Sequence, residues 1–524
     1  MSALQVLPPS IADLVVENYP TIVGVLVVYF AIFAVLSVTA HRRLTSSVSD
    51  YVLGSRELGW AVTSFTLFAS ISSGVGLAGF PGTVYVVGLP FSITVVFGFF
   101  VAVSLVWFLG RRIWILGDAH DFTTPGDLLG TYYGSDTVRA YTVVTSLVFN
   151  VAYAVAQFTA GGILVHVLSG GIVSTTTGVA LVAGLVAVHV VTTGIRGIAW
   201  LDTYNGVVML GTVAIYTAYI FADAGGPAAV IAGLGDAGAA HVSVPGTVGA
   251  FTPSYIYGTV VGLLIGIAVM APAAWLRFYA TEDPDGLMNV GAALVVMFML
   301  LHFVGIYWIG SYGRVVFPEV ANPDFVSSLL AFEVMPPALA ATFLVALLAA
   351  IISTTDSYIH TLSATVTRDL GKAVFVPELT DRAEVRLNYA IVGLTTLVSA
   401  VLAVRYTGLI TALAVFAGGV TVQLLPATLG ALVWPRSSTP AALSATGLGI
   451  VLTFVWELGL APSPIAPNVL PGLAVAFLVN LALFVGVSFV TSSRPTATIE
   501  AFHGVLHRRL SDGDSEDPTA SASD

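Results

Sequence analysis

Residues 353–357, with the sequence STTDS, place five oxygen-bearing side chains in a row within an otherwise apolar stretch, and Thr361 follows one helical turn later. Hydroxyl and carbonyl oxygens with at most one carboxylate suit a hard, singly charged cation such as Na⁺. Ca²⁺ would prefer more carboxylates, and Zn²⁺ would prefer nitrogen or sulfur. Alternatively, the hydroxyls bond back to carbonyls of the preceding turn. The pattern alone leaves both interpretations open.

Three carboxylates lie within apolar stretches, and each is a candidate functional residue because burying a charge in a membrane is costly. Asp356 belongs to the STTDS cluster. Asp202 follows shortly after Arg196, so it is either a site residue or a charge at a helix end, and Glu457 is interpreted as interfacial. The histidines in apolar stretches show no metal-ligand spacing and are interpreted as core or interfacial residues: His166, His189, His302 and His360. An enzyme would need a nucleophile with a base or a metal triad, and no such spacing is present.

The elements that must position these residues are membrane helices. The 524 residues are 57% hydrophobic and 9% charged, whereas soluble domains carry roughly 25% charged residues. Residues 58–110 and 140–195 contain no Asp, Glu, Lys or Arg, and each run holds two spans because one membrane helix needs roughly 20 apolar residues. This excludes a nucleic-acid binder, a soluble enzyme, a secreted module and an outer-membrane barrel. The absence of cysteine excludes disulfides and thiolate sites.

Hydropathy predicts an all-α integral membrane protein with thirteen transmembrane helices within residues 21–491. The spans are 21–40, 58–87, 91–110, 138–168, 172–194, 197–222, 254–278, 287–312, 337–368, 385–404, 407–433, 438–458 and 469–491. Placing the N-terminus (1–20) outside puts 16 of the 18 basic residues, Arg277 among them, in cytoplasmic loops, and leaves Arg314 and Arg405 outside. We therefore expect a plasma-membrane protein whose acidic tail (492–524) is cytoplasmic and disordered.

Two spans contain residues that break helices. Residues 70–82 of the second span hold four glycines and a proline, and residues 262–272 of the seventh hold Gly262, Gly266 and Pro272. Interrupted helices at matching positions of two five-helix halves are typical of an inverted-repeat transporter with a site at the midplane. The repeats would be about 58–222 and 254–433. Close packing through small residues is the alternative.

Four blocks of the sequence resemble the sodium:solute symporter family, which includes proline, galactose and pantothenate carriers. They are residues 49–60 (SDYVLGSRELGW) continuing into 68–74 and 79–85, residues 194–205 (GIRGIAWLDTYN), residues 272–278 (PAAWLRF), and residues 349–357 (AAIISTTDS) with 367–370 (TRDL). The resemblance covers nearly the whole chain. It implies a five-plus-five inverted-repeat core of the LeuT type, with broken first and sixth core helices.

The resemblance also implies a Na⁺ site between the second and ninth spans. Its ligands would be the carbonyls of Ala69, Ser72 and Ala350 and the hydroxyls of Ser353 and Thr354. Asp202 matches an aspartate on the inner sodium path, and Asp356 lies near the ion site. The sequence departs from the family at Leu201 and Asn205, where Thr and Gln are usual, which leaves the details of the inner path open.

The implied activity is sodium-coupled import of a small organic solute by alternating access. Because the polar set of the sugar carriers is not evident, an amino acid or carboxylate such as proline, pantothenate or acetate is favoured. Candidate substrate-binding residues, each of which could also be ordinary packing, are Ser73, Gly74, Tyr153, Gln157, Tyr255, Trp275, Phe416 and Gln423. An uncoupled or proton-coupled carrier of the same fold is the alternative. The expected partners are the solute, the coupling ion Na⁺ and the lipid bilayer, with no nucleic acid and no protein partner inferred.

Overall fold

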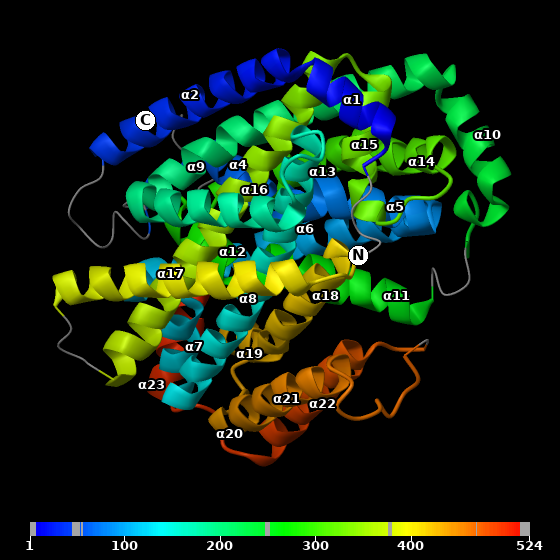
Figure 1. Cartoon of the computed structure of the whole chain (residues 1–524). Coiled ribbons are helices and arrows are strands. Elements are labelled where there is room, and N and C mark those ends of the chain that lie inside the picture. Colours follow the sequence, from blue (N-terminus) through cyan, green and yellow to red (C-terminus); the bar gives the residue numbers. More distant parts are fainter. Residues whose placement is uncertain are drawn as a thin grey trace, which may run out of the picture.

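The computed structural model describes residues 7–43, 53, 56–246, 252–375, 380–467 and 469–513 (Figure 1). Among these residues the secondary structure is helical, apart from an isolated bridge between Leu58 and Thr281. Parts of three predicted segments lie outside the described residues: the start of the N-terminus (1–6), part of the first family block (49–52, 54 and 55) and the end of the acidic tail (514–524).

Within the described residues, eleven helical spans are long and apolar enough to cross a membrane, and twelve if a bent pair of helices counts as one more. The α-helices in these spans are α2 (Tyr19–Arg43), α4 (Trp60–Ser72) with α5 (Phe80–Val87), α6 (Leu89–His120), α8 (Asp136–Leu168), α9 (Thr175–Ala224), α11 (Pro253–Tyr257) with α12 (Pro272–Ala280), α13 (Gly286–Met299) with α14 (Tyr307–Val316), α16 (Pro337–Thr365), α17 (Asp381–Arg405), α18 (Ile410–Thr421) with α19 (Leu425–Val433), α20 (Thr439–Ala441) with α21 (Gly447–Glu457), and α22 (Gly472–Val490).

Shorter helices connect and flank the spans. They are α1 (Pro9–Glu17), α7 (Pro125–Tyr133), α10 (Pro227–Ala237), α15 (Val326–Val334), α23 (Thr496–Ile499) and α24 (Val505–Gly513). Helix α9 contains the predicted span 197–222 and residues 175–194 of the predicted span 172–194, and its first apolar part, Thr175–Val191, is shorter than the spans counted above.

The second predicted span bends at its glycines. Helix α4 ends at Ser72, and Ser73 leaves the helical conformation with φ −34° and ψ −149°. The chain resumes as a π-helical segment, η2 (Val75–Gly79), that leads into α5, and the two halves of the span are inclined by 52°. The break leaves the last carbonyl groups of α4 without partners in their own helix.

The seventh predicted span also changes conformation near its middle. The π-helical segment η4 (Gly258–Met270) ends before Ala271, whose φ of −61° and ψ of 135° are extended. Proline disfavours the α conformation of the residue before it, so Pro272 accounts for this geometry. Gly266 lies directly against the backbone of Gly418 in α18, and a side chain at either position would prevent that approach.

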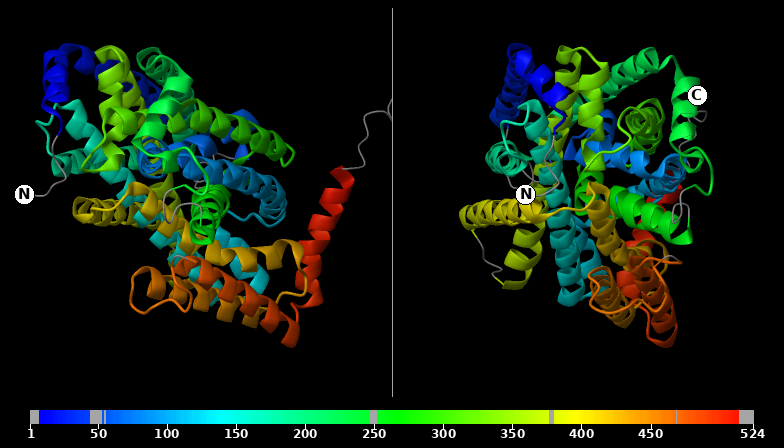
Figure 2. Two further views of the ribbon diagram at one scale, coloured as in Figure 1. Left: turned by 90° about the vertical axis from the view of Figure 1, so that its right-hand side faces the viewer. Right: turned by 45° about the vertical axis from the view of Figure 1, so that its right-hand side comes forward.

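The broken span lies inside the bundle, where α4 packs against α9, α13 and α16. Helix α16 also contacts α8 and α2, and its residues 340–341 and 343–365 are buried. By contrast, α17 projects at the edge of the bundle in both views of Figure 2. The core of the molecule is therefore built around α4, α9 and α16.

Candidate sodium and solute sites

Helix α16 supplies partners for the carbonyl groups that the break of α4 leaves free. The hydroxyl of Thr354 donates a hydrogen bond to the carbonyl of Ala69 (3.1 Å), and the hydroxyl of Tyr358 donates to the carbonyl of Ser70 (3.1 Å). Ala69 and Thr354 have no exposed surface. Two of the five predicted Na⁺ ligands, which are 285 residues apart in the sequence, are therefore in direct contact.

The remaining predicted ligands lie on the same two helices. The hydroxyl of Ser353 lies 3.4 Å from the carbonyl of Ala350 and accepts a hydrogen bond from the side-chain amide of Asn205 (3.1 Å). Ser72 is the last residue of α4, and its buried hydroxyl has no hydrogen-bond partner among the described residues. These oxygen atoms are the ligand type that suits Na⁺.

Asp202 belongs to a buried charged cluster beside α4. Arg277 of α12 donates to Asp202 (3.2 Å), to Thr66 of α4 (2.9 Å) and to Ser357 of α16 (2.8 Å), and Thr66 also donates to Asp202. Asp202 is fully buried and Arg277 is 2% exposed. The prediction that Arg277 lies in a cytoplasmic loop is wrong. The arginine is buried, and it compensates the charge of Asp202.

Asp356 points away from α4. It pairs with His189 of α9, whose other ring nitrogen lies 3.1 Å from the hydroxyl of Ser37 in α2. Residues two apart on a helix do not share a face, so Thr354 reaches α4 while Asp356 reaches α9. The interpretation of His189 as a core residue missed this pair, and no local sequence signal joins residues 167 positions apart.

Four of the predicted substrate-binding residues meet at the break. The amide of Gln157 on α8 donates to the hydroxyl of Ser73 (2.8 Å), and its oxygen accepts from the backbone N–H of Gly74 (3.0 Å). The hydroxyl of Tyr153 lies 3.5 Å from that of Ser73 and 3.4 Å from the carbonyl of Ile71. The bend after Ser72 therefore carries two polar groups, the Ser73 hydroxyl and the Gly74 N–H, and the side-chain amide of Gln157 binds both.

The other four predicted residues have partners elsewhere. The indole of Trp275 donates to the carbonyl of Val269 (3.1 Å), and Gln423 accepts from Asn480 of α22 (3.0 Å). The rings of Tyr255 and Phe416 pack on other aromatic side chains, Phe91 (6.5 Å between centroids) and Phe454 (6.0 Å) respectively. Among the described contacts, none joins these four to the hydrogen bonds of Ser73 and Gln157.

A buried carboxylate that the sequence did not single out lies beyond the break. Asp324, in the loop segment η6 (Pro323–Phe325), is fully buried and accepts from the backbone N–H of Ile410, the first residue of α18 (3.0 Å). Its other oxygen has no hydrogen-bond partner within the described chain and lies beside Gly82 of α5. Burial raises the pKa of Asp324 to about 7. The loop thus joins α5 to α18, whose threonines Thr83 and Thr411 also meet (2.9 Å).

Known proteins resemble this chain in sequence and in fold. The profile of the sodium:solute symporter family matches residues 51–449. The sodium/pantothenate symporter of Escherichia coli (strain K12) is 28% identical over 495 residues, which are 90% of this chain and 97% of that protein. The high-affinity proline transporter of Bacillus subtilis (strain 168) is 26% identical over 477 residues, 88% of this chain and 97% of that protein.

The chain belongs to the sodium:solute symporter family.

Two solved structures of transporters have a fold similar to that of this chain. A Na⁺-coupled sialic acid symporter in a substrate-bound, outward-open state matches with a TM-score of 0.75 and 14% identity, over 90% of this chain and 98% of that one. A nucleobase-cation-symport-1 family transporter matches with a TM-score of 0.52 and 16% identity, over 87% and 99%. Members of the sodium:solute symporter family are secondary transporters, so the prediction that this chain is a transporter and not an enzyme is confirmed.

Proposed function

We propose that this protein is a plasma-membrane symporter that uses Na⁺ to import a small amino acid or carboxylate by alternating access. Its thirteen spans would place the N-terminus outside and the C-terminus in the cytoplasm. Residues 58–222 and 254–433 would form the two inverted repeats of a LeuT-type core. The bend after Ser72 and the extended Ala271 before α12 support this proposal, because they interrupt the first helix of each repeat.

The observation that carries the proposal is the hydrogen bond from Thr354 to the carbonyl of Ala69. This hydrogen bond joins α16 to the carbonyl end of α4, where the helix is interrupted. Both residues are buried, and further carbonyl and hydroxyl oxygen atoms lie on the same two helices. A Na⁺ bound there, with Ser72, Ala350 and Ser353 as further ligands, would fasten α4 to α16. Coupling follows if Na⁺ binds the state in which these helices are joined more tightly than the state in which they separate.

The same break supports binding of an anionic or zwitterionic solute. The side-chain amide of Gln157 holds the hydroxyl of Ser73 and the N–H of Gly74 in place, so that a solute carboxylate could accept hydrogen bonds from the Ser73 hydroxyl and the Gln157 amide. The helical segment that begins after the break presents the positive end of its dipole to the same region, which favours negative charge. Pantothenate and proline, the solutes named for the relatives, both carry a carboxylate.

A proton-coupled carrier of the same fold is the second candidate function. The observation that favours it is the buried pair of His189 and Asp356, because Asp356 lies two residues from Thr354 in the sequence. The two candidates differ in the ion gradient that they need, a sodium gradient or a pH gradient, whereas the membrane potential contributes about 2.3 kcal/mol per charge for each 100 mV to either.

Uptake by the purified protein in liposomes tests the proposal. Labelled proline, pantothenate, acetate, pyruvate, urea and galactose are offered with and without an inward Na⁺ gradient, at constant pH. We expect one amino acid or carboxylate to accumulate only with Na⁺, and the double variant Ser353→Ala, Thr354→Ala to lose this dependence. Equal uptake without Na⁺ contradicts the proposal, and uptake driven by a pH gradient alone supports the proton-coupled alternative.

A further inference from the structure

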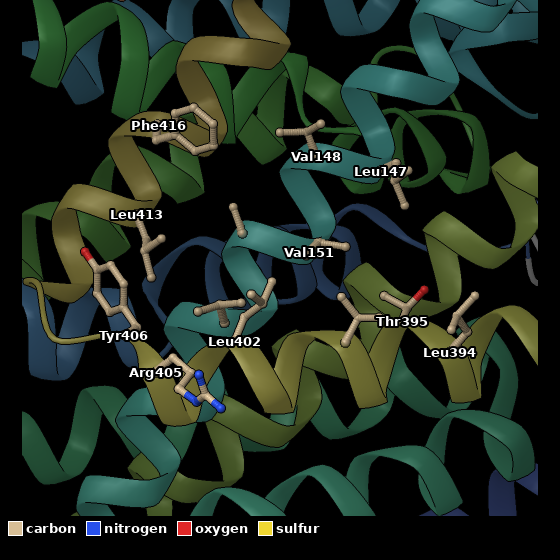
Figure 3. Close-up of a pocket in the computed structure, with 13 residues that line it drawn as sticks. Leu147, Val148, Val151, Leu394, Thr395, Leu402, Arg405, Tyr406, Leu413 and Phe416 are labelled. Atoms are coloured by element: carbon tan, nitrogen blue, oxygen red, sulfur yellow. The ribbon is translucent and has the colours of Figure 1, made fainter. Parts of the chain in front are cut away.

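An apolar groove of 680 Å³ opens on the bundle between α8, α17 and α18 (Figure 3). Its volume falls within the range of small-molecule sites, about 300–1,000 Å³. Ten of the thirteen residues around it are apolar, and the polar ones are Thr395, Arg405 and Tyr406. The groove lies on the side of α8 that carries Val151 and Val155. It is therefore distinct from the break, where Tyr153 and Gln157 of the same helix bind.

The groove has one charged end. Arg405 is the last residue of α17 and is exposed, and it has no hydrogen bond or ion pair with any residue that the structure describes. The next residue, Tyr406, is half-buried and donates its hydroxyl hydrogen bond to the carbonyl of Leu409 (2.8 Å). The other basic residue predicted on the outer side, Arg314, is already occupied by Tyr85 and the carbonyl of Pro318. Of the two basic residues predicted on the outer side, Arg405 is therefore the one that is available to a ligand.

The α17 wall of the groove is apolar and exposed. Leu394, Leu402 and Val398 of α17 are 64%, 46% and 40% exposed, and α17 projects at the edge of the bundle in Figure 2. Exposed apolar side chains along a membrane helix pack against hydrocarbon chains. An arginine and a tyrosine at the end of a span are typical of the membrane–water interface. Figure 3 shows Arg405 and Tyr406 together at one end of the groove, beyond Leu402.

We propose that this groove binds an anionic phospholipid, with an acyl chain along α8, α17 and α18 and its phosphate on Arg405. The apolar walls require a hydrocarbon occupant, and the unpaired guanidinium requires an anion at the headgroup level. A guanidinium binds phosphate oxygens through two parallel hydrogen bonds. A lipid in this position would hold α17 against α8, the helix that carries Gln157 on its other side, so occupancy would also affect transport. The inference does not depend on Na⁺ coupling.

Native mass spectrometry of the purified full-length protein tests the assignment. Delipidated protein is titrated with phosphatidylglycerol, and in parallel with phosphatidylcholine of the same acyl chains. We expect one phosphatidylglycerol to remain bound in preference to phosphatidylcholine. Arg405→Ala should weaken its binding about fivefold, which corresponds to about 1 kcal/mol for one basic residue near a membrane surface.

Two variants of α17 make the result specific. Arg386, exposed on the same helix but outside the groove, serves as the matched control, and Arg386→Ala should leave phosphatidylglycerol binding unchanged. Leu402→Trp fills the groove and should lower the binding of both lipids. The proposal is overturned if Arg405→Ala binds phosphatidylglycerol like the wild type, or if Arg386→Ala weakens it equally. It is also overturned if the groove is covered by a second copy, detected as a dimer that Leu402→Trp dissociates.

Discussion

Substituting Gly74 by alanine tests the close approach of α8 and α16 to the break. A β-carbon at this position would lie 2.8 Å from the side-chain oxygen of Gln157, 2.9 Å from the β-carbon of Ala160 and 2.9 Å from Ile351. The glutamine oxygen can move, but the methyl group of Ala160 moves only with its helix. Inserting a methyl group into such a space costs about 1–3 kcal/mol of stability.

Gly76 provides a matched control two residues away. A β-carbon there would meet its nearest atom, the β-carbon of Ser72, at 3.7 Å, which is an ordinary contact. Since alanine is preferred to glycine inside a helix by up to about 1 kcal/mol, Gly76→Ala should be neutral or slightly stabilising. The two variants should therefore differ by about 1–4 kcal/mol in free energy of unfolding.

Thermal unfolding and solute uptake by the two variants measure this difference. Gly74→Ala displaces the oxygen of Gln157 from the N–H of Gly74, a bond worth about 1 kcal/mol, so its apparent KM for the solute should rise several-fold while that of Gly76→Ala stays the same. If Gly74→Ala matches Gly76→Ala in both stability and KM, then the break is not packed against α8 as the structure shows, and Gln157 does not contribute to the site through Gly74.

Three further substitutions give separate outcomes. The pKa of Asp324 is raised from 3.8 to about 7, so the folded protein binds a proton more tightly than the unfolded chain. This contribution to stability is lost as pH rises towards 7 and changes little above it, and Asp324→Asn should remove that slope between pH 5 and 7 in thermal unfolding. Asp202→Asn leaves the buried Arg277 without its counter-ion and should destabilise the protein by roughly 3–5 kcal/mol in chemical unfolding. Gln157→Leu removes bonds of 2.8 and 3.0 Å and should raise the solute KM more than Tyr153→Phe, whose hydroxyl contacts are 3.4 and 3.5 Å.

Each of these predictions has an outcome that contradicts it. For Asp324→Asn, the contradicting outcome is a stability that depends on pH between 5 and 7 as it does in the wild type. For Asp202→Asn the comparison is Asp118→Asn, which breaks an ion pair with Arg509 that is about 40% exposed and should cost less than about 1 kcal/mol. Equal destabilisation by the two aspartate variants would refute the role of burial. For the α8 variants, a larger KM effect from Tyr153→Phe would place the solute nearer to the tyrosine than to the glutamine.

The sequence predicts the helical class and most of the spans because membrane helices depend on local apolar content. It also places the first break, since the glycines of residues 70–82 cannot maintain a continuous helix, and the chain bends there by 52°. Family membership, inferred from four motifs, is confirmed by the match over residues 51–449. The position of the Na⁺ ligands came from the resemblance, and their role in ion binding remains a prediction.

Contacts between distant helices could not be predicted from the sequence. Arg277 looks like an ordinary basic residue at a membrane boundary, and only the packing of α12 against α4 and α16 shows that it neutralises Asp202. His189 and Asp356 carry no shared motif, and their pairing depends on the angle at which α9 crosses α16. Asp324 lies in a short loop, where hydropathy gives no indication of burial.

The Na⁺ dependence of uptake by two threonine variants tests the central claim most directly. The hydroxyl of Thr354 crosses to the carbonyl of Ala69, whereas that of the neighbouring Thr355 bonds back to Ile351 in its own helix (2.6 Å). Valine removes either hydroxyl with little change in shape. We predict that Thr354→Val raises the Na⁺ concentration for half-maximal uptake about tenfold, equivalent to 1.4 kcal/mol, and that Thr355→Val leaves it unchanged. Equal Na⁺ dependence in both variants would contradict a sodium site between α4 and α16.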